Sequence, residues 1–116
     1  RMGKKRPPLT EEQKKKTPEI EHPAVRTHPY TGKKCLFVNE AYTTKIVGMS
    51  DEESKALLAE LYTHLIRPEF IYAHKWEVGD LLFWDNCATQ HRAIVDYALP
   101  LRRLMERTTI DGTVPY

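Results

Sequence analysis

The chain has 116 residues, so it is one domain or part of one, because domains commonly run to about 100–150 residues. Its 18 Lys and Arg against 16 Asp and Glu give a formal charge of +2, which is too small to indicate a nucleic-acid partner. It has no signal peptide, no run of about 18 apolar residues and only two cysteines, so we expect a cytoplasmic protein that does not enter the membrane.

Residues 1–21 form a basic segment with three prolines and almost no apolar side chains. Such a segment cannot bury enough surface to offset the entropy of ordering it, so we expect a mobile loop or arm. A nucleic-acid-binding tail is the alternative. We disfavour it because no aromatic residue lies among the basic ones to stack on bases.

The next segment, from His22 to Val38, predicts a β-hairpin. An extended piece bounded by prolines leads into the turn Tyr30–Lys33, and an apolar strand follows from Lys34. His22 and His28 could suggest a metal site. Each is followed by Pro and has no carboxylate two residues on, so we favour structural or surface histidines.

A helix is predicted from Asp51 to about Ile66. Ser50 and Glu53 have the spacing of a capping box, in which both side chains satisfy amides at a helix start. A leucine stripe follows on one helical face, and we expect it to pack on a sheet. Its members are Leu57, Leu58, Leu61 and Leu65. The helix should end before Pro68, because the residue preceding a proline disfavours helical geometry.

The rest of the chain predicts strands, at 69–76, 81–84, 91–95 and 103–110, with a turn at 78–80. With the hairpin this gives at least five strands against one helix and no alternation of strand and helix. That pattern indicates a mainly β fold, such as a sandwich or jelly roll, with one α-helix packed outside.

Arginines recur at alternate positions in the last of these segments. Side chains alternate faces along a strand, so Arg103, Met105 and Arg107 should share one face. Two guanidinium groups facing a cavity would bind carboxylate or sulfonate groups through paired hydrogen bonds. A solvated outer face is the alternative. A lone histidine such as His91 is likewise more often a hydrogen-bonding residue than a ligand.

An ordered series of motifs favours the functional interpretation of His91 and the two arginines. In the last third they are Trp84-Asp85-Asn86, Gln90-His91, Asp96-Tyr97 and Arg102-Arg103-x-Met105-x-Arg107-x-Thr109. Upstream they are His22-Pro23-x-Val25-Arg26-Thr27-His28-Pro29 and Leu36-Phe37-Val38-Asn39-Glu40-x-Tyr42-Thr43-Thr44-x-Ile46-Val47. From about Glu21 to Pro115 the sequence resembles the taurine/2,4-dichlorophenoxyacetate dioxygenase family, which uses Fe(II) and 2-oxoglutarate, and its taurine dioxygenase branch most closely.

The resemblance implies a double-stranded β-helix, or jelly roll, and a role for each matching residue. His91 matches the second histidine of a two-histidine, one-carboxylate iron site. Arg103, with eleven residues between it and His91, matches the arginine that holds 2-oxoglutarate. Arg107 matches an arginine that meets the anionic end of substrate or cosubstrate, and Tyr42 an aromatic that lines the substrate pocket. We expect Trp84 and Asn86 to shape the turn before His91.

One departure from the family is as informative as the match. The first metal motif, His-x-Asp or His-x-Glu, is missing, because none of the five histidines has a carboxylate two residues later. One imidazole alone does not hold iron. We therefore expect residues 22–116 to be the C-terminal part of a longer dioxygenase, with weak metal binding and no turnover in isolation.

The leading prediction is that the whole enzyme hydroxylates a small anion, taurine or a related alkyl sulfonate, and yields succinate, CO2, aldehyde and sulfite. Sulfate esters and aryloxyacetates stay open as substrates, as does a homo-oligomer. One alternative is a metal-free β-sandwich remnant that binds anions through Arg103 and Arg107. A Cys-His hydrolase using Cys87 and His91 is a weaker one, because their spacing does not define an activated nucleophile.

Overall fold

The structure is a computed structural model that describes residues 18–94, 97–98, 100 and 103–116. The predicted arm at 1–21 therefore falls mostly outside the described residues, as do Val95, Asp96 and Arg102. The chain divides into two units, one of residues 1–21 and 91–114 and the other of residues 22–90 and 115–116. The second unit holds all the regular secondary structure among the described residues.

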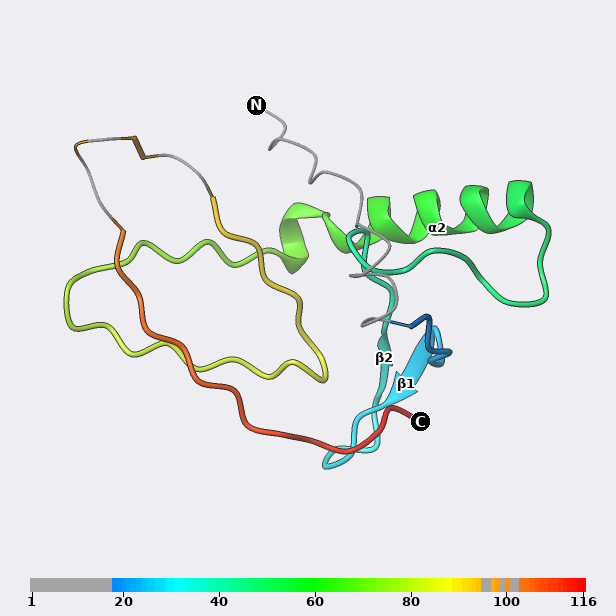
Figure 1. Ribbon diagram of the computed structural model, residues 1–116, viewed down its shortest axis with the longest axis horizontal. Helices are drawn as coiled ribbons and strands as arrows, with labels where there is room; N and C mark the ends of the chain where they lie inside the picture. The colour runs from blue at the N-terminus through cyan, green and yellow to red at the C-terminus, as the bar shows by residue number, and fades with distance from the viewer. Residues whose placement is uncertain (1–17, 95–96, 99, 101–102) are drawn as a thin grey trace. The chain divides into compact units, whose positions relative to one another are not determined.

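The predicted hairpin is confirmed. Strands β1 (Val25–Thr27) and β2 (Lys34–Leu36) pair antiparallel, with Arg26 opposite Cys35 (Figure 1). The turn closes through His28 N–H donating to Lys33 O at 2.8 Å. Gly32 lies at φ 69° in this turn, in the left-handed region that glycine enters without a steric penalty. The C-terminal residue joins the same unit, since Thr27 N–H donates to Tyr116 O at 2.6 Å.

The predicted helix is also confirmed, as α2 (Asp51–Leu65). The Ser50 hydroxyl accepts from Glu53 N–H at 3.3 Å, and Glu53 Oε2 accepts from Ser50 N–H at 3.0 Å, so the capping box is complete. The helix ends with Ile66 as its C-cap, and Pro68 begins the short 3-10 helix η1 (Pro68–Phe70). Local signals therefore fix both ends of α2.

The leucine stripe of α2 is only partly buried, and its packing on a sheet stays a prediction. Leu58 is buried, while Leu57, Leu61 and Leu65 are half-buried. The polar contacts of α2 run to the connection at residues 39–48, because Ile46 N–H donates to the buried Ser54 Oγ at 2.7 Å. Tyr62 Oη donates to Asn39 O at 3.5 Å in the same region. Within this unit, the helix is thus held against a connecting loop.

The remaining predicted strands are not formed in the part of the chain that the structure describes. Residues 68–70 adopt a 3-10 helix, and 71–76, 81–84, 91–94 and 103–110 have no assigned strand. Aromatic and β-branched residues favour extended backbone, but a strand also needs a neighbour for its amide and carbonyl groups. Of the predicted strands, the described residues therefore contain the two of the hairpin, and the jelly roll stays a prediction. The turn at 78–80 is confirmed by Asp80 N–H donating to Glu77 O at 3.2 Å.

Little apolar surface is buried by the described residues. Val38 and Leu58 are the buried hydrophobic side chains among them, with 1% and 5% of their surface exposed. Leu81, Phe83 and Leu104 are in contrast almost fully exposed. Across the described ranges, no helix combines the length and apolar character that a membrane crossing would require.

Candidate functional site

Asp85 folds the turn that precedes His91. Its Oδ1 accepts from Cys87 N–H at 2.7 Å, and its backbone carbonyl accepts from Thr89 N–H at 3.0 Å. An aspartate whose side chain binds an amide two residues on makes an Asx turn. Trp84 Nε1–H donates to Asn86 Oδ1 at 2.9 Å, so the two residues expected to shape the turn contact each other at its start. The sequence alone did not single out Asp85, which organises it.

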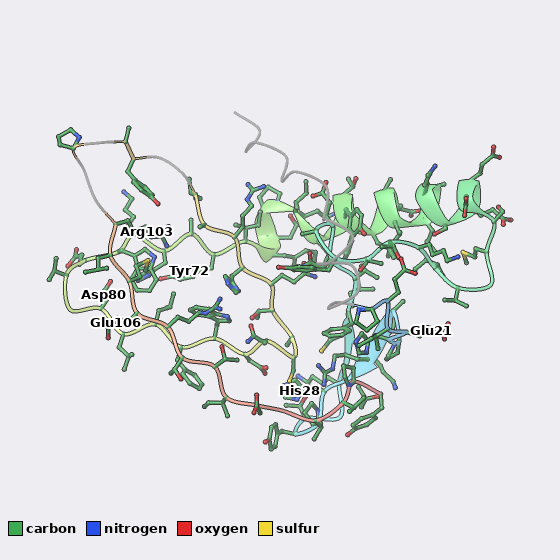
Figure 2. The ribbon with its side chains drawn as sticks, in the orientation of Figure 1. Glu21, His28, Tyr72, Asp80, Arg103 and Glu106 are labelled. Atoms are coloured by element: carbon green, nitrogen blue, oxygen red, sulfur yellow. The ribbon has the colours of Figure 1, made fainter. Side chains whose placement is uncertain are left out.

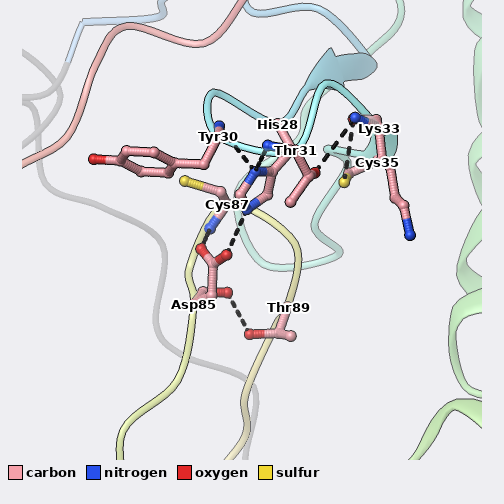
Figure 3. Close-up of polar contacts among 8 residues, drawn as sticks. All are labelled: His28, Tyr30, Thr31, Lys33, Cys35, Asp85, Cys87 and Thr89. Atoms are coloured by element: carbon pink, nitrogen blue, oxygen red, sulfur yellow. Dashed lines mark hydrogen bonds and ion pairs between the residues drawn. The ribbon is translucent and has the colours of Figure 1, made fainter.

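His28 binds Asp85 from the hairpin turn (Figure 3). Its Nε2 lies 2.6 Å from Asp85 Oδ2, and its Nδ1 accepts from Tyr30 N–H at 3.2 Å and Thr31 N–H at 3.1 Å. Because Nδ1 accepts two amides, we assign the imidazole proton to Nε2, which then donates to the carboxylate. With 8% of its surface exposed, His28 is a buried structural histidine, the first of the two predicted alternatives.

The pKa values of Asp85 and Cys87, which lie in this turn, are shifted in opposite directions. The hydrogen bond from His28, followed by the one from Cys87 N–H, lowers the pKa of Asp85 below its ordinary value. Burial, and then the hydrogen bond to Asp85, raises the pKa of Cys87. Cys87 is therefore a thiol beside a carboxylate, and a raised pKa is the opposite of what a cysteine nucleophile needs. This counts against the Cys-His hydrolase alternative.

Gln90 anchors the other end of the turn. Its Nε2 donates to Val38 O at 2.6 Å, and its Oε1 accepts from Asn39 Nδ2 at 3.1 Å. Asn39 also begins the turn that carries Tyr42, because its carbonyl accepts from Tyr42 N–H at 3.1 Å and Thr43 N–H at 2.8 Å. The residue before His91 is thus bound to the start of the Tyr42 turn. The phenol of Tyr42 is 74% exposed.

His91, Arg103 and Arg107 belong to the other unit, and all three side chains are exposed. Arg103 Nε–H donates to Met105 Sδ. This contact confirms that Arg103 and Met105 share one face of the segment, as alternation along an extended chain predicted. The predicted site residues are therefore divided between the units, with Tyr42 in one and the histidine and arginines in the other.

No group of three His, Cys, Asp or Glu side chains with metal-binding geometry occurs among the residues that the structure describes. The donor chemistry of His91 itself suits Fe(II), since a neutral imidazole is a ligand that this ion accepts. A complete iron site would need further ligands in addition to His91.

A second polar cluster joins Tyr72, His74 and Asp80 around the turn at 78–80; Tyr72 and Asp80 are labelled in Figure 2. His74 Nε2 lies 3.0 Å from Asp80 Oδ2, and its Nδ1 lies 3.2 Å from the Tyr72 hydroxyl. Glu77 N–H also donates to Asp80 Oδ2 at 2.9 Å. The backbone bond from Glu77 and then the bond from His74 lower the pKa of Asp80. The cluster closes the turn, and sequence reasoning did not find it.

Arg26 is a buried cation on β1, with 4% of its surface exposed. Its guanidinium carbon lies 4.9 Å from the centroid of the Phe37 ring, a cation–π arrangement. Its Nε and Nη2 have no hydrogen-bond partner among the described residues. Unpaired buried donors are costly, so an anionic or carbonyl partner would stabilise this side chain.

Comparison with known proteins supplies the family. The model of the taurine catabolism dioxygenase TauD, TfdA family matches residues 2–109. An alpha-ketoglutarate-dependent 2,4-dichlorophenoxyacetate dioxygenase from Cupriavidus pinatubonensis is 41% identical over 106 residues, which cover 90% of this chain and 36% of that protein. An alpha-ketoglutarate-dependent sulfate ester dioxygenase from Pseudomonas putida is 41% identical over 97 residues, covering 84% of this chain and 32% of that protein.

A third relative comes from a eukaryote. An alpha-ketoglutarate-dependent sulfonate dioxygenase from Saccharomyces cerevisiae is 39% identical over 95 residues, which cover 81% of this chain and 23% of that protein. The chain thus spans about a third or less of the length of the curated relatives it matches. Their names share the alpha-ketoglutarate cosubstrate and differ in the anionic group of the substrate.

Proposed function

The chain belongs to the taurine catabolism dioxygenase TauD, TfdA family, and we propose that it is the C-terminal part of an Fe(II)- and 2-oxoglutarate-dependent dioxygenase. The observation that carries the proposal is the family match over residues 2–109, which includes His91, Arg103 and Arg107. The relatives named above as alpha-ketoglutarate-dependent dioxygenases support it. Iron and 2-oxoglutarate, when bound, supply the oxidising chemistry and release succinate and CO2.

In this proposal His91 supplies one neutral imidazole to the iron, and the other ligands come from the rest of the polypeptide. Arg103 holds the distal carboxylate of 2-oxoglutarate. Its guanidinium suits this role because the planar fork makes two parallel, charge-assisted hydrogen bonds to a carboxylate. The contact of Arg103 with Met105 places an apolar thioether beside that fork.

The proposed substrate is a small anion, most specifically taurine or another alkyl sulfonate. Arg107 binds its anionic end and Tyr42 packs against its carbon chain. Hydroxylation of the carbon that bears a sulfonate gives an unstable product, which separates into an aldehyde and sulfite. Aryloxyacetates, sulfate esters and sulfonates, the classes named for the relatives, all carry an anion that Arg107 could meet.

The proposed parent fold is a jelly roll, and the exposed apolar side chains support it. Leu81, Phe83 and Leu104 alternate with other residues in extended segments, and 96%, 82% and 94% of their surfaces are exposed. Side chains of this kind are normally covered in a stable domain. The remaining strands of the longer protein would cover them and provide the missing ladder partners. Free Cys35 and Cys87 fit a cytoplasmic setting.

The test uses the full-length polypeptide that contains this chain. Purified protein is incubated with Fe(II), O2 and 2-oxoglutarate, and succinate is measured with taurine, an alkyl sulfonate, a sulfate ester or an aryloxyacetate. We expect succinate formation that requires Fe(II) and rises strongly with one of these anions. Binding of an anion with no iron-dependent succinate from any of them would overturn the proposal and favour the metal-free alternative.

A further inference from the structure

Three polar side chains form a hydrogen-bonded chain beside the turn at residues 78–80. The Tyr72 hydroxyl lies 3.2 Å from His74 Nδ1, and His74 Nε2 lies 3.0 Å from Asp80 Oδ2. All three residues belong to the unit formed by residues 22–90 and 115–116, and Tyr72 and Asp80 are labelled in Figure 2. A hydroxyl, an imidazole and a carboxylate in this order match a nucleophile, its general base and the group that orients the base.

The carboxylate at the end of this chain sets the direction of both hydrogen bonds. Asp80 Oδ2 also accepts from Glu77 N–H at 2.9 Å, and the bonds from Glu77 and then His74 lower the pKa of Asp80. An ionised carboxylate only accepts, so His74 Nε2 carries a proton and donates it. In a neutral imidazole the other nitrogen, Nδ1, is then an acceptor, and the Tyr72 hydroxyl donates to it.

The neighbouring rings hold the imidazole in place and leave the phenol open. Tyr72, His74 and Trp76 occupy alternate positions, and each ring contacts the next. The rings of His74 and Trp76 meet edge to face, with centroids 4.9 Å apart. The His74 side chain is 24% exposed, whereas Tyr72 is 79% exposed. The base is thus partly covered, while the hydroxyl it contacts is accessible to a small molecule from solvent.

We propose that Tyr72 is an activated nucleophile and a covalent modification site for acyl donors, with His74 as its general base and Asp80 as a positioning residue. Tyr72 Oη forms a bond to the acyl carbonyl carbon while its proton moves to His74 Nδ1. The bond from that carbon to the leaving group then breaks, and the leaving group departs with the electron pair. The products are O-acyl-Tyr72, the released anion and an imidazolium beside Asp80, which returns its extra proton to solvent.

Another phenol of the same unit provides an internal comparison. Tyr30 is 92% exposed, and the described residues offer its hydroxyl no hydrogen-bond partner. If exposure alone decided reactivity, Tyr30 would react at least as fast as Tyr72. Faster reaction of Tyr72 therefore reports the base. The site is separate from the proposed iron and 2-oxoglutarate chemistry, which uses none of its residues.

The experiment treats the full-length, iron-free protein with p-nitrophenyl acetate and follows acetylation of Tyr72 and Tyr30 by mass spectrometry of the digested protein. We expect Tyr72 to be acetylated about 100-fold faster than Tyr30, because a positioned general base typically contributes at least this much. His74→Asn keeps an acceptor near the position of Nδ1 but has no base, so Tyr72 should then react about as slowly as Tyr30. Lys75→Ala, at an exposed neighbouring position, is the matched control and should leave both rates unchanged.

Asp80→Asn separates the role of the carboxylate in the reaction from its role in the turn. The amide oxygen can still accept from Glu77 N–H, but the charge beside the imidazolium is lost. We expect acetylation of Tyr72 to fall about tenfold, and nitrogen NMR of His74 to show the proton shared between Nδ1 and Nε2. A lower melting temperature with an unchanged Tyr72 rate would show that Asp80 only closes the turn.

Two results would overturn the inference as a whole. One is equal acetylation of Tyr72 and Tyr30 in the wild type, which needs no variant and so does not depend on how any substitution folds. The other is a wild-type rate at Tyr72 in His74→Asn protein.

Discussion

Gln90 donates a hydrogen bond from Nε2 to the backbone carbonyl of Val38 at 2.6 Å, across 52 residues of sequence. Val38 is the most buried hydrophobic residue among those described, with 1% of its surface exposed. The bond therefore attaches Gln90, the residue before His91, to a buried residue of the unit formed by residues 22–90 and 115–116. It gives the turn at residues 85–90 a position set by tertiary structure as well as by its own sequence.

Removing the Gln90 side-chain amide should break its hydrogen bond to Val38 O and destabilise the folded protein. Gln90→Ala leaves the Val38 carbonyl and the Asn39 amide without their partner, and we expect a loss of about 1 kcal/mol in the free energy of unfolding. Urea denaturation of the full-length protein measures it. Gln90→Glu tests the donor alone, because Glu keeps an acceptor for Asn39 but presents an oxygen to Val38 O. Unchanged stability in both variants would contradict a structural role for this bond.

The capping box of α2 offers a local test. Ser50→Ala removes the hydroxyl that accepts from Glu53 N–H, and we expect a loss of about 1 kcal/mol in unfolding free energy. Lys55→Ala, at an exposed position of the same helix, is the control and should change stability little. Far-UV circular dichroism during urea denaturation measures both. An equal effect of the two substitutions would show that the cap does not stabilise α2.

The pH dependence of stability should report the bond between His28 and Asp85. Because the folded pKa of Asp85 is lowered, its contribution is present above the ordinary carboxyl pKa of about 3.9 and is lost as pH falls through the folded value. His28→Asn removes the largest cause of the shift, so the pKa of Asp85 should rise. Carboxyl NMR titration measures it, with Asp111→Asn as a control for resonance assignment. An Asp85 pKa unchanged by His28→Asn would refute the assigned cause.

The turn closed by Asp80 should depend on a glycine. Gly79 lies at φ 95°, and a Cβ there would meet nothing within 4 Å, so the cost of Gly79→Ala comes from backbone strain alone. We expect it to destabilise the protein by about 1–2 kcal/mol. Gly112→Ala is the matched control, because Gly112 also has open space but no positive φ. Equal melting temperatures for the two variants would contradict the strained-turn explanation.

Local structure could be predicted from the sequence where the signal is local. Ser50 and Glu53 defined the start of α2, Pro68 its end, and the Tyr30–Lys33 turn the hairpin, because each depends on residues only a few positions apart. The pairing of the extended segments in the last third could not be predicted in the same way. Their composition gives strand propensity, but pairing depends on neighbours that propensity does not specify.

The supporting contacts of the candidate site were missed for a related reason. His28 was predicted to be a structural or surface histidine and is structural, but its partner Asp85 lies 57 residues away. Likewise Gln90 is part of the motif that suggested the family, yet nothing in that motif names Val38 as its acceptor. The sequence shows which side chains can form hydrogen bonds. It does not show which distant residue each one contacts, because the fold determines that.

The most direct test is a pair of binding measurements on the full-length protein without oxygen. We predict that His91→Ala abolishes Fe(II) binding. Arg103→Lys should keep Fe(II) binding but weaken 2-oxoglutarate by about tenfold or more, because losing a charged hydrogen bond costs roughly 1.5–3 kcal/mol. Arg67→Lys is the control and should change neither affinity. Wild-type affinities for both ligands in His91→Ala and Arg103→Lys would contradict the assignment of this chain to the iron and 2-oxoglutarate site.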